Sequence, residues 1–378
     1  MISHAFTLIL ALKAVQASDT TGNTQRVNIT LGFVSYYCSI RNTEYNSSLV
    51  SNYTTNFDPI LVNIEDNSGV AYYDDLGMLA AVERVNNDPT ILPGVHVNIK
   101  RFSDCGTYDP NAAADYAGDS AGFASAVTAW DIAEVHKDVV GVISNEYSTV
   151  TAGIAEILSA SMIPMCGTCA GSPRMSNKET YPYYWRMLSA DYSRQMLLIL
   201  EKWNVKRVGI IYQDDSEIGL QLWKAMKREF AQVAISVVAT VKLSRNFDKA
   251  AANYTTQALQ SSDCRYIIIS GTGAFVASIL ASQSTLIGSK WVWMSYNFPQ
   301  ANGDPTQLYG PDFYSYLRGF IIVGDIKTTP NELYHQLNNM AGSILAHDSF
   351  VENCVCEAYD CTMMMLLGFD KVSLQDGF

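Results

Sequence analysis

Basic charge is scarce in this chain of 378 residues. It has 25 Lys and Arg against 37 Asp and Glu, a formal net charge of −12, and no run of basic residues. Proteins that bind nucleic acid neutralise phosphates with Lys and Arg, so nucleic acid is excluded as a partner. Charged residues make up 16% and hydrophobic residues 48% of the chain, which indicates a globular protein with a large core.

Long apolar runs are missing beyond the first residues. A transmembrane helix needs about 20 consecutive apolar residues. The tract Cys361–Phe369 is shorter and is flanked by Asp360 and Asp370. The chain as given is not expected to cross a membrane, so any membrane link would come through a segment absent from it.

Known catalytic and nucleotide-binding signatures are also missing. The sequence has no GxSxG elbow, HExxH pair, Walker A loop or EF-hand loop, and its five histidines show no ligand spacing. Gly271-Thr272-Gly273 is similar to the start of a dinucleotide motif, but Val276 occupies the third glycine position, which favours a tight strand-to-helix turn. We expect neither an enzyme nor a metal or other cofactor.

Several features are typical of a secreted or cell-surface protein. An apolar core at Ala5–Leu12 followed by Val15-Gln16-Ala17 predicts a signal peptide over residues 1–17. Eight cysteines, an even number, are compatible with disulfides in an oxidising compartment. Candidate glycosylation sequons begin at Asn28, Asn46, Asn52 and Asn253.

From residue 27 onward, apolar β-branched tracts alternate with segments of helical periodicity. This alternation is typical of parallel α/β sheets. It occurs as two blocks with a seam near Ser189–Asp191, which predicts two doubly wound Rossmann-like lobes joined by a hinge. Strands are expected over 27–36, 95–102, 139–143, 162–165, 183–188, 207–212, 235–241, 266–270, 291–294 and 319–323. Helices are expected over 73–87, 111–136, 192–204, 217–230, 247–260, 274–287, 331–346 and 356–369.

The stretch Val139–Leu158 runs from an apolar strand through a polar turn into an amphipathic helix. The start of such a helix presents free backbone N–H groups and suits an anion or carboxylate. Ser148 and Thr149 add hydroxyls there. Two interpretations stay open: Ser148 binds a ligand at the carboxyl end of the strand, or it only caps its own helix.

Cys166 and Cys169 have CxxC spacing, and three further cysteines cluster near the end of the chain. A zinc site would need four ligands that meet in space. Disulfides or buried thiols are favoured in a secreted chain. We therefore interpret the CxxC pair as structural or as part of a site lining.

Five stretches, in order along the chain, resemble the receptor family ligand-binding region. This family has the type I periplasmic-binding-protein fold. It forms the ectodomains of class C G-protein-coupled receptors and natriuretic-peptide-type receptor guanylate cyclases, and the amino-terminal domains of ionotropic glutamate receptors. The matching stretches are Ala80–Gly94 (AAVERVNNDPTILPG), Phe102–Gly106, Val139–Met165, Gly171–Asp215 and Glu357–Lys371 (EAYDCTMMMLLGFDK).

The resemblance implies a set of site residues. In members that bind amino acids, the turn before the helix and a small-residue loop after the next strand hold the ligand's carboxylate. These positions correspond here to Ser148, Thr149, Cys169, Ala170, Gly171 and Ser172. Asp191 falls where such receptors place a hinge residue that meets an ammonium. The resemblance also implies a disulfide between Cys38 and Cys105.

The resemblance further divides the chain into lobe 1 (18–190), lobe 2 (191–323) and a return segment with a late lobe-1 helix (324–378). Ectodomains of the family continue with further lobe-two elements and usually a transmembrane segment. The second lobe is thus expected to be incomplete at the C-terminus. A fragment of a receptor and a shortened secreted relative both remain open.

The function expected from the resemblance is an extracellular ligand-binding domain of a transmembrane signalling receptor. It would sense a small molecule, such as an amino acid, by cleft closure, and would form a homo- or heterodimer through lobe 1. The alternative is a soluble secreted small-molecule-binding protein without a signalling role. An α/β enzyme is disfavoured because a paired nucleophile and base are not found near Ser148.

Overall fold

The computed structural model describes residues 26–35, 69–103, 120–146, 148–188, 192–299, 304–324, 332, 335 and 355–375. The chain divides into two compact units. Unit 1 contains the described residues up to Ala170, those within Met175–Leu188, and those after Thr328. Unit 2 contains Gly171–Arg174 and the described residues within Ser189–Lys327.

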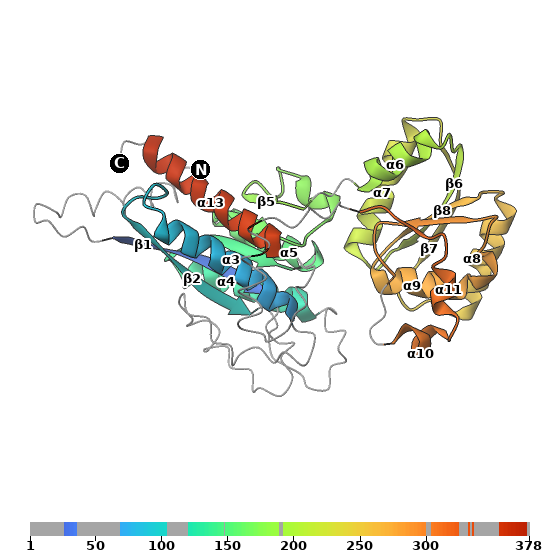
Figure 1. Cartoon of the computed structure of the whole chain (residues 1–378), viewed down its shortest axis with the longest axis horizontal. Helices are drawn as coiled ribbons and strands as arrows, with labels where there is room; N and C mark the ends of the chain where they lie inside the picture. Colours follow the sequence, from blue (N-terminus) through green and yellow to red (C-terminus); the bar gives the residue numbers. More distant parts are fainter. Residues whose placement is uncertain are drawn as a thin grey trace, which may run out of the picture. The chain divides into compact units, whose positions relative to one another are not determined.

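The described part of unit 1 is built around a five-stranded sheet (Figure 1). Its elements are β1 (Val27–Ser35), α3 (Gly69–Asn87), β2 (Val95–Ser103), α4 (Ser120–Glu134), β3 (Val139–Asn145), α5 (Ser148–Ala160), β4 (Met165–Gly167), β5 (Tyr184–Arg186) and α13 (Val355–Gln375). All the strand pairs are parallel, in the order β2-β1-β3-β4-β5. The chain therefore builds outward from β1 in both directions, and the strand order reverses between β1 and β3.

Alternate residues of β1 face the two sides of this sheet, as the period of two in a strand requires. Leu31 and Phe33 are buried with residues of α3 and α13, whereas Val34 is buried with residues of α4 and α5. Helices thus cover both faces of the sheet, which is the doubly wound arrangement.

The late helix α13 packs along α3 and completes one face of unit 1 (Figure 1). Gly77 of α3 allows this approach, because a Cβ there would collide with the backbone carbonyl of Val355. Cys361 of α13 is disulfide-bonded to Cys166 of β4, which lies 195 residues earlier in the sequence, with a Cα–Cα distance of 5.7 Å. A distant segment of the chain is in this way fixed to the sheet.

Unit 2 repeats the architecture with a second five-stranded sheet in its described part. Its elements are α6 (Tyr192–Lys202), β6 (Arg207–Gln213), α7 (Glu217–Ala231), β7 (Ser236–Leu243), α8 (Lys249–Ser261), β8 (Tyr266–Ser270), α9 (Gly273–Ser282), η5 (Ser284–Leu286), β9 (Val292–Ser295), α10 (Pro305–Tyr309), α11 (Phe313–Tyr316) and β10 (Ile321–Ile322). The strands are parallel in the order β10-β9-β8-β6-β7.

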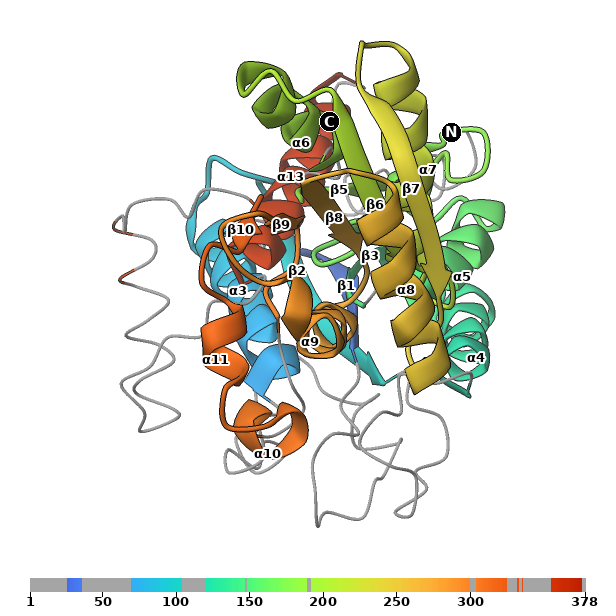
Figure 2. The same cartoon turned by 90° about the vertical axis from the view of Figure 1, so that its right-hand side faces the viewer.

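Helices cover both faces of this second sheet as well. Residues of α6 and α7 share a buried cluster with Val208, Ile210 and Ile268 on one face. Residues of α8 and α9 pack with Ile211 and Ile267 on the other, and these two helices lie on the near side of the sheet in Figure 2. The predicted fold class, two doubly wound α/β lobes, is therefore confirmed.

Three predicted segments of unit 2 differ from the structure. The helix expected over 274–287 ends at Ser282 and continues only as the 3-10 turn η5. No helix was expected between the predicted strands 291–294 and 319–323, but the structure has the short helix α10 there, whose N-cap Asp304 accepts a hydrogen bond from the backbone N–H of Thr306. The strand expected over 319–323 has only two residues, because β10 pairs with β9 through Ile321 and Ile322 alone.

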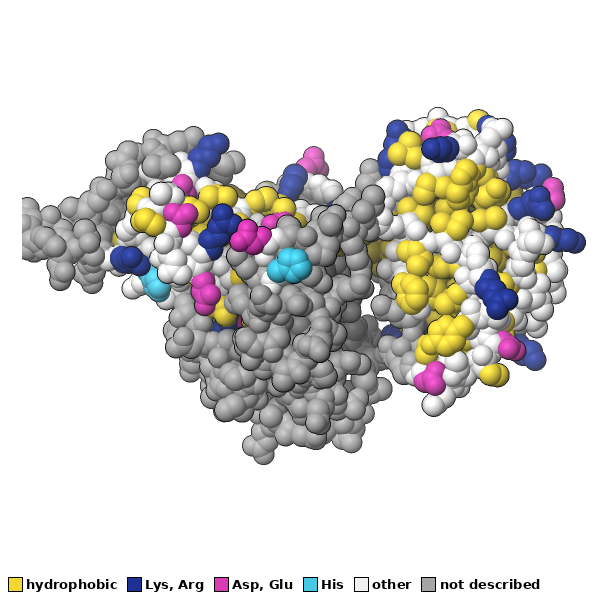
Figure 3. Space-filling model, in the orientation of Figure 1, with side chains coloured by type: hydrophobic (Ala, Val, Ile, Leu, Met, Phe, Trp, Pro, Cys, Tyr) yellow, Lys and Arg dark blue, Asp and Glu magenta, His cyan; other side chains and the backbone are white. Residues whose placement is uncertain are grey.

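Large apolar side chains are exposed on both units, and they form patches on the face of unit 2 that Figure 3 shows. In unit 1 they include Val127 and Trp130 of α4, which are 50% and 58% exposed. None of the helices in the described part of the chain combines the length and hydropathy that a membrane span needs.

Candidate functional site

The carboxyl edge of the unit-1 sheet, where β1, β3 and β4 end, gathers the predicted site residues that belong to this unit. β1 ends at Ser35, which is the register partner of Asn145 at the end of β3. The chain then enters α5 at Ser148, and β4 leads into Thr168 and Cys169. Because the strand order reverses between β1 and β3, this edge is where ligands bind in open α/β sheets.

Ser148 is the first residue of α5 and is only 6% exposed, whereas the next residue, Thr149, is exposed. The turn before the helix is held by the Thr151 hydroxyl, which donates to the backbone carbonyl of Glu146 at 2.8 Å. The first N–H groups of an α-helix have no partner within the helix. The position therefore suits an anion, and the predicted capping role of Ser148 is compatible with the same geometry.

The predicted loop after β4 divides between the two units. Cys169 is half-buried and disulfide-bonded, and the carbonyl of the buried Ala170 accepts a hydrogen bond from the Arg186 guanidinium at 2.7 Å. Gly171 and Ser172 are grouped with unit 2. The Ser172 hydroxyl is fully buried and accepts from the backbone N–H of Arg174.

Several predicted positions lie outside the described residues. They are Asp191, both cysteines of the predicted Cys38–Cys105 disulfide, and two of the four sequons, at Asn46 and Asn52. The other two sequon residues are exposed, Asn28 in β1 and Asn253 in α8. Exposure is what glycosylation needs, and their modification stays a prediction.

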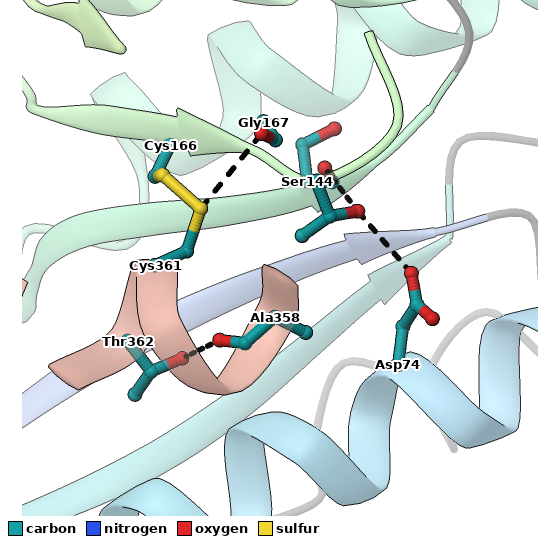
Figure 4. Close-up of a disulfide and its surroundings, with 8 residues drawn as sticks. Asp74, Ser144, Cys166, Gly167, Ala358, Cys361 and Thr362 are labelled. Atoms are coloured by element: carbon teal, nitrogen blue, oxygen red, sulfur yellow. Dashed lines mark hydrogen bonds between the residues drawn. A yellow bond between two sulfur atoms is a disulfide. The ribbon is translucent and has the colours of Figure 1, made fainter. Parts of the chain in front are cut away.

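Sequence reasoning missed a buried carboxyl group at this edge. Asp74 of α3 has no exposed surface, and its Oδ2 accepts a hydrogen bond from the Thr168 hydroxyl at 3.2 Å (Figure 4). Burial raises the pKa of the Asp74 carboxyl well above its usual range; the hydrogen bond from Thr168 opposes this rise, and the negative charges of Glu357 and Asp75 add to it. Its Oδ1 has no hydrogen-bond partner among the described residues.

The neighbouring carboxylate, Asp75, is in a different situation. It forms a two-point ion pair with Arg101 of β2, with distances of 2.6 Å from Nε to Oδ1 and 2.8 Å from Nη2 to Oδ2. Both side chains are almost completely buried. The signal in the sequence was the pair of acids within the apolar helix segment YYDDLGMLAAV, together with an arginine inside the strand VHVNIKRFS.

Both cysteines of the CxxC pair at this edge form disulfides. Cys166 pairs with Cys361 (Figure 4) and Cys169 is also disulfide-bonded, so the structural interpretation of the CxxC pair is confirmed. Two cysteines of the described part, Cys264 and Cys356, are free thiols.

The carboxyl edge of the unit-2 sheet is tied together by its own polar side chains. The Gln213 amide donates to Asp215 at 2.9 Å, and its oxygen accepts from both the backbone N–H and the hydroxyl of Thr272. Thr272 in turn caps α9, and a Cβ at Gly271 would collide with Phe275. The segment Gly271–Gly273 is therefore the predicted tight strand-to-helix turn.

The chemistry available at the unit-1 edge is recognition by hydrogen bonds and charge. It offers a helix start with a hydroxyl at Ser148, a buried carboxyl group at Asp74, and a backbone fixed by a disulfide. Within the described residues, no group of three His, Cys, Asp or Glu side chains could hold a metal ion.

Comparison with known proteins points to one family. The model of the family described as "Receptor family ligand binding region" matches residues 74–373. Metabotropic glutamate receptor 4 of Macaca fascicularis is 27% identical over 213 residues, which cover 51% of this chain and 22% of that receptor. Its counterpart in Mus musculus is 28% identical over 213 residues, covering 51% of this chain and 22% of that receptor.

A metabotropic glutamate receptor of Drosophila melanogaster is 26% identical over 183 residues, or 44% of this chain and 18% of the receptor. The matches therefore cover about a fifth of the length of these relatives.

Proposed function

Because the chain belongs to the receptor family ligand-binding region, as its sequence predicted, we propose that it is the extracellular ligand-binding domain of a transmembrane signalling receptor. Its ligand is a small molecule. The observation that carries this proposal is the buried start of α5 at the reversal of strand order, where Ser148 lies among other buried polar groups. The receptors that it resembles support a signalling role over a catalytic one.

In this proposal the ligand is captured first at Ser148, Thr149 and the loop Cys169–Ser172 of the predicted lobe 1, and Asp191 meets an ammonium of the ligand. Closure of the two lobes about a hinge then follows. A ligand shifts such an equilibrium only by the difference between its affinities for the open and closed states. The buried α5 start supports a carboxylate-bearing ligand, such as an amino acid, because helix N-termini favour negative charge.

We test capture with Ser148→Ala and Ser148→Asp, each expressed as the full chain and screened by thermal shift against amino acids, nucleosides and small acids. A ligand that binds the native state raises its apparent stability. We expect Ser148→Asp to abolish the shift by repelling an anionic group, and Ser148→Ala to weaken it. Ser159→Ala in the same helix is the matched control and should leave the shift unchanged. Equal shifts in all variants would remove Ser148 from the site.

Dimerisation through lobe 1 is the second part of the proposal. Val127 and Trp130 lie three residues apart on α4, so they share one side of the helix. Each side chain is at least half exposed. Exposed tryptophan is typical of protein interfaces. Trp130→Glu should shift the full chain toward monomer in sedimentation, whereas Trp203→Glu, at an exposed tryptophan of unit 2, should not. An unchanged association constant for Trp130→Glu would exclude α4 from the interface.

The proposal includes secretion through the predicted signal peptide, and glycosylation. The rival function is a soluble secreted binding protein, which would bind the same ligand without a signalling partner. Reading the transcript beyond codon 378 for a transmembrane helix, and labelling intact cells with an impermeant reagent, distinguishes the two. Recovery of all the protein from the medium would favour the rival.

A further inference from the structure

Two side-chain oxygen atoms of the described residues are buried without a hydrogen-bond partner on the face of the unit-1 sheet that α3 covers. They are Oδ1 of Asp74 and the hydroxyl of Ser35, and neither residue has exposed surface. Ser35 continues the alternation of Leu31 and Phe33, so it faces the side that α3 covers. Buried polar groups in native proteins nearly always have partners. Two such oxygens on one face of the sheet therefore suit a partner from outside the chain.

The positions of the surrounding groups place Asp74 at the middle of the edge. Asp75 reaches Arg101 on β2, while Asp74 reaches Thr168 just beyond β4. β1 and β3 lie between β2 and β4 in the strand order, and Ser35 ends β1. Figure 4 shows Asp74 extending from α3 toward the strand end that carries Ser144. Ser144 also has an unpartnered hydroxyl, but it alternates with Val142 and so belongs to the opposite face.

The charges around Asp74 indicate whether that partner is positive or negative. Asp75 is the next residue in α3, and its negative charge and that of Glu357 in α13 both raise the pKa of Asp74. The negative charge of Asp74 in turn raises the pKa of the Cys356 thiol. In the part of the chain that the structure describes, the cation Arg101 is paired with Asp75. A second negative group would be repelled here, whereas a positive group would be attracted.

We propose that Asp74 and Ser35 bind a cationic group of the ligand, an ammonium or guanidinium, so that this receptor domain recognises an organic cation such as a basic amino acid. This inference rests on the proposed ligand-binding function and names its ligand class. Ammonium and guanidinium groups carry several N–H donors and no acceptor, which matches a carboxylate oxygen and a hydroxyl oxygen. Calcium would need six to eight oxygen ligands, and in the described part of the chain no three-residue metal cluster exists.

Binding of this kind is linked to a proton. Without a cation, Asp74 can be neutralised by a proton, which leaves to solvent when the cation takes its place. The pair then forms between an ionised carboxylate and the ligand cation, with Thr168 donating to the second oxygen. Affinity for the cation should therefore rise as the pH rises.

The test uses the full chain and titration calorimetry with L-lysine, L-arginine and L-norleucine, the last of which lacks the ε-ammonium of lysine. Equimolar sodium chloride serves as the inorganic cation. We expect lysine or arginine to bind at least about tenfold more tightly than norleucine, and Asp74→Asn to remove that preference. Ser35→Ala should weaken lysine binding less. Glu83→Gln, which removes an exposed acid from the same helix, is the charge-matched control and should bind as the parent does.

Equal affinity for lysine and norleucine, undiminished lysine binding by Asp74→Asn, or no binding of either basic amino acid would each overturn the cation subsite. The proposal would also be overturned if sodium chloride gave a heat of binding with the parent chain but not with Asp74→Asn, because the site would then bind an inorganic ion. The proposed function fails separately, when no compound of the wider screen shifts the melting of the parent chain. Binding of an acidic or neutral compound would leave that function standing without this subsite.

Discussion

Replacing Asp74 by Asn should change how the stability of unit 1 depends on pH. The substitution keeps the size and shape of the side chain and removes only its ability to ionise. Asp74 has no exposed surface, and a single hydrogen bond of 3.2 Å from Thr168 stabilises its charged form. Burial is the largest cause of its raised pKa, and the charges of Glu357 and Asp75 act in the same direction.

The sign follows from proton linkage. An unfolded Asp has a pKa of about 4, and the folded protein holds the proton to higher pH. The proton on Asp74 therefore contributes stability that is complete below the unfolded pKa and is lost as the pH rises through the folded pKa. Between the two values the free energy of unfolding falls by up to about 1.4 kcal/mol per pH unit. In Asp74→Asn this contribution is absent, so the variant should gain stability relative to the parent as pH increases.

Hydrogen exchange of peptides from α3 and β4, followed by mass spectrometry, is the suitable measurement, because the two units need not unfold as one cooperative transition. The opening free energies of these segments in the parent and in Asp74→Asn should be similar in acid and should differ increasingly toward neutral pH, where the variant is the more stable. Glu83→Gln should run parallel to the parent. If Asp74→Asn also runs parallel to the parent at every pH, then Asp74 is ionised and compensated, and the reasoning about its burial is refuted.

Two further substitutions probe how unit 1 is held together. Asp75→Asn should destabilise it by about 3–5 kcal/mol in urea unfolding, because Arg101 is left as a buried charge. Replacing both residues by Leu should recover most of this loss. A loss below about 1 kcal/mol for Asp75→Asn would contradict a buried ion pair. Gly77→Ala should cost about 1–3 kcal/mol through its collision with α13. Gly153→Ala is the matched control: no atom lies within 4 Å of its Cβ, so we expect a gain of about 0.5–1 kcal/mol. Equal effects at the two glycines would argue against the close approach.

The fold was predictable because its signal is local. Buried parallel strands such as Val139–Asn145 are continuous apolar tracts, and the helices between them have a separate period, so the alternation is visible without any tertiary information. Helix α10 was not predicted, although its signal is local as well. Asp304 followed by Pro305 is an N-cap followed by the favoured first residue of a helix.

The candidate site was predictable only in part, because its electrostatics depend on a distant segment. Ser148 could be placed from the strand, turn and helix around it. Asp74 could not, because the sequence shows two adjacent acids in an apolar helix segment but not which of them pairs with Arg101. The difference arises from packing. α13 returns against α3 at Gly77 and is fixed to β4 through Cys361.

The same return brings Glu357 close enough to act on Asp74. A pattern of polar and apolar residues indicates which side of a helix is buried, but it does not indicate which acid has a cation as its neighbour. Within the described residues, Arg101 pairs with Asp75, and Asp74 forms no ion pair. The positive charge proposed for the ligand at this edge of the sheet thus depends on contacts among β2, α3, β4 and α13. It can be inferred only from the packing of these four elements against one another.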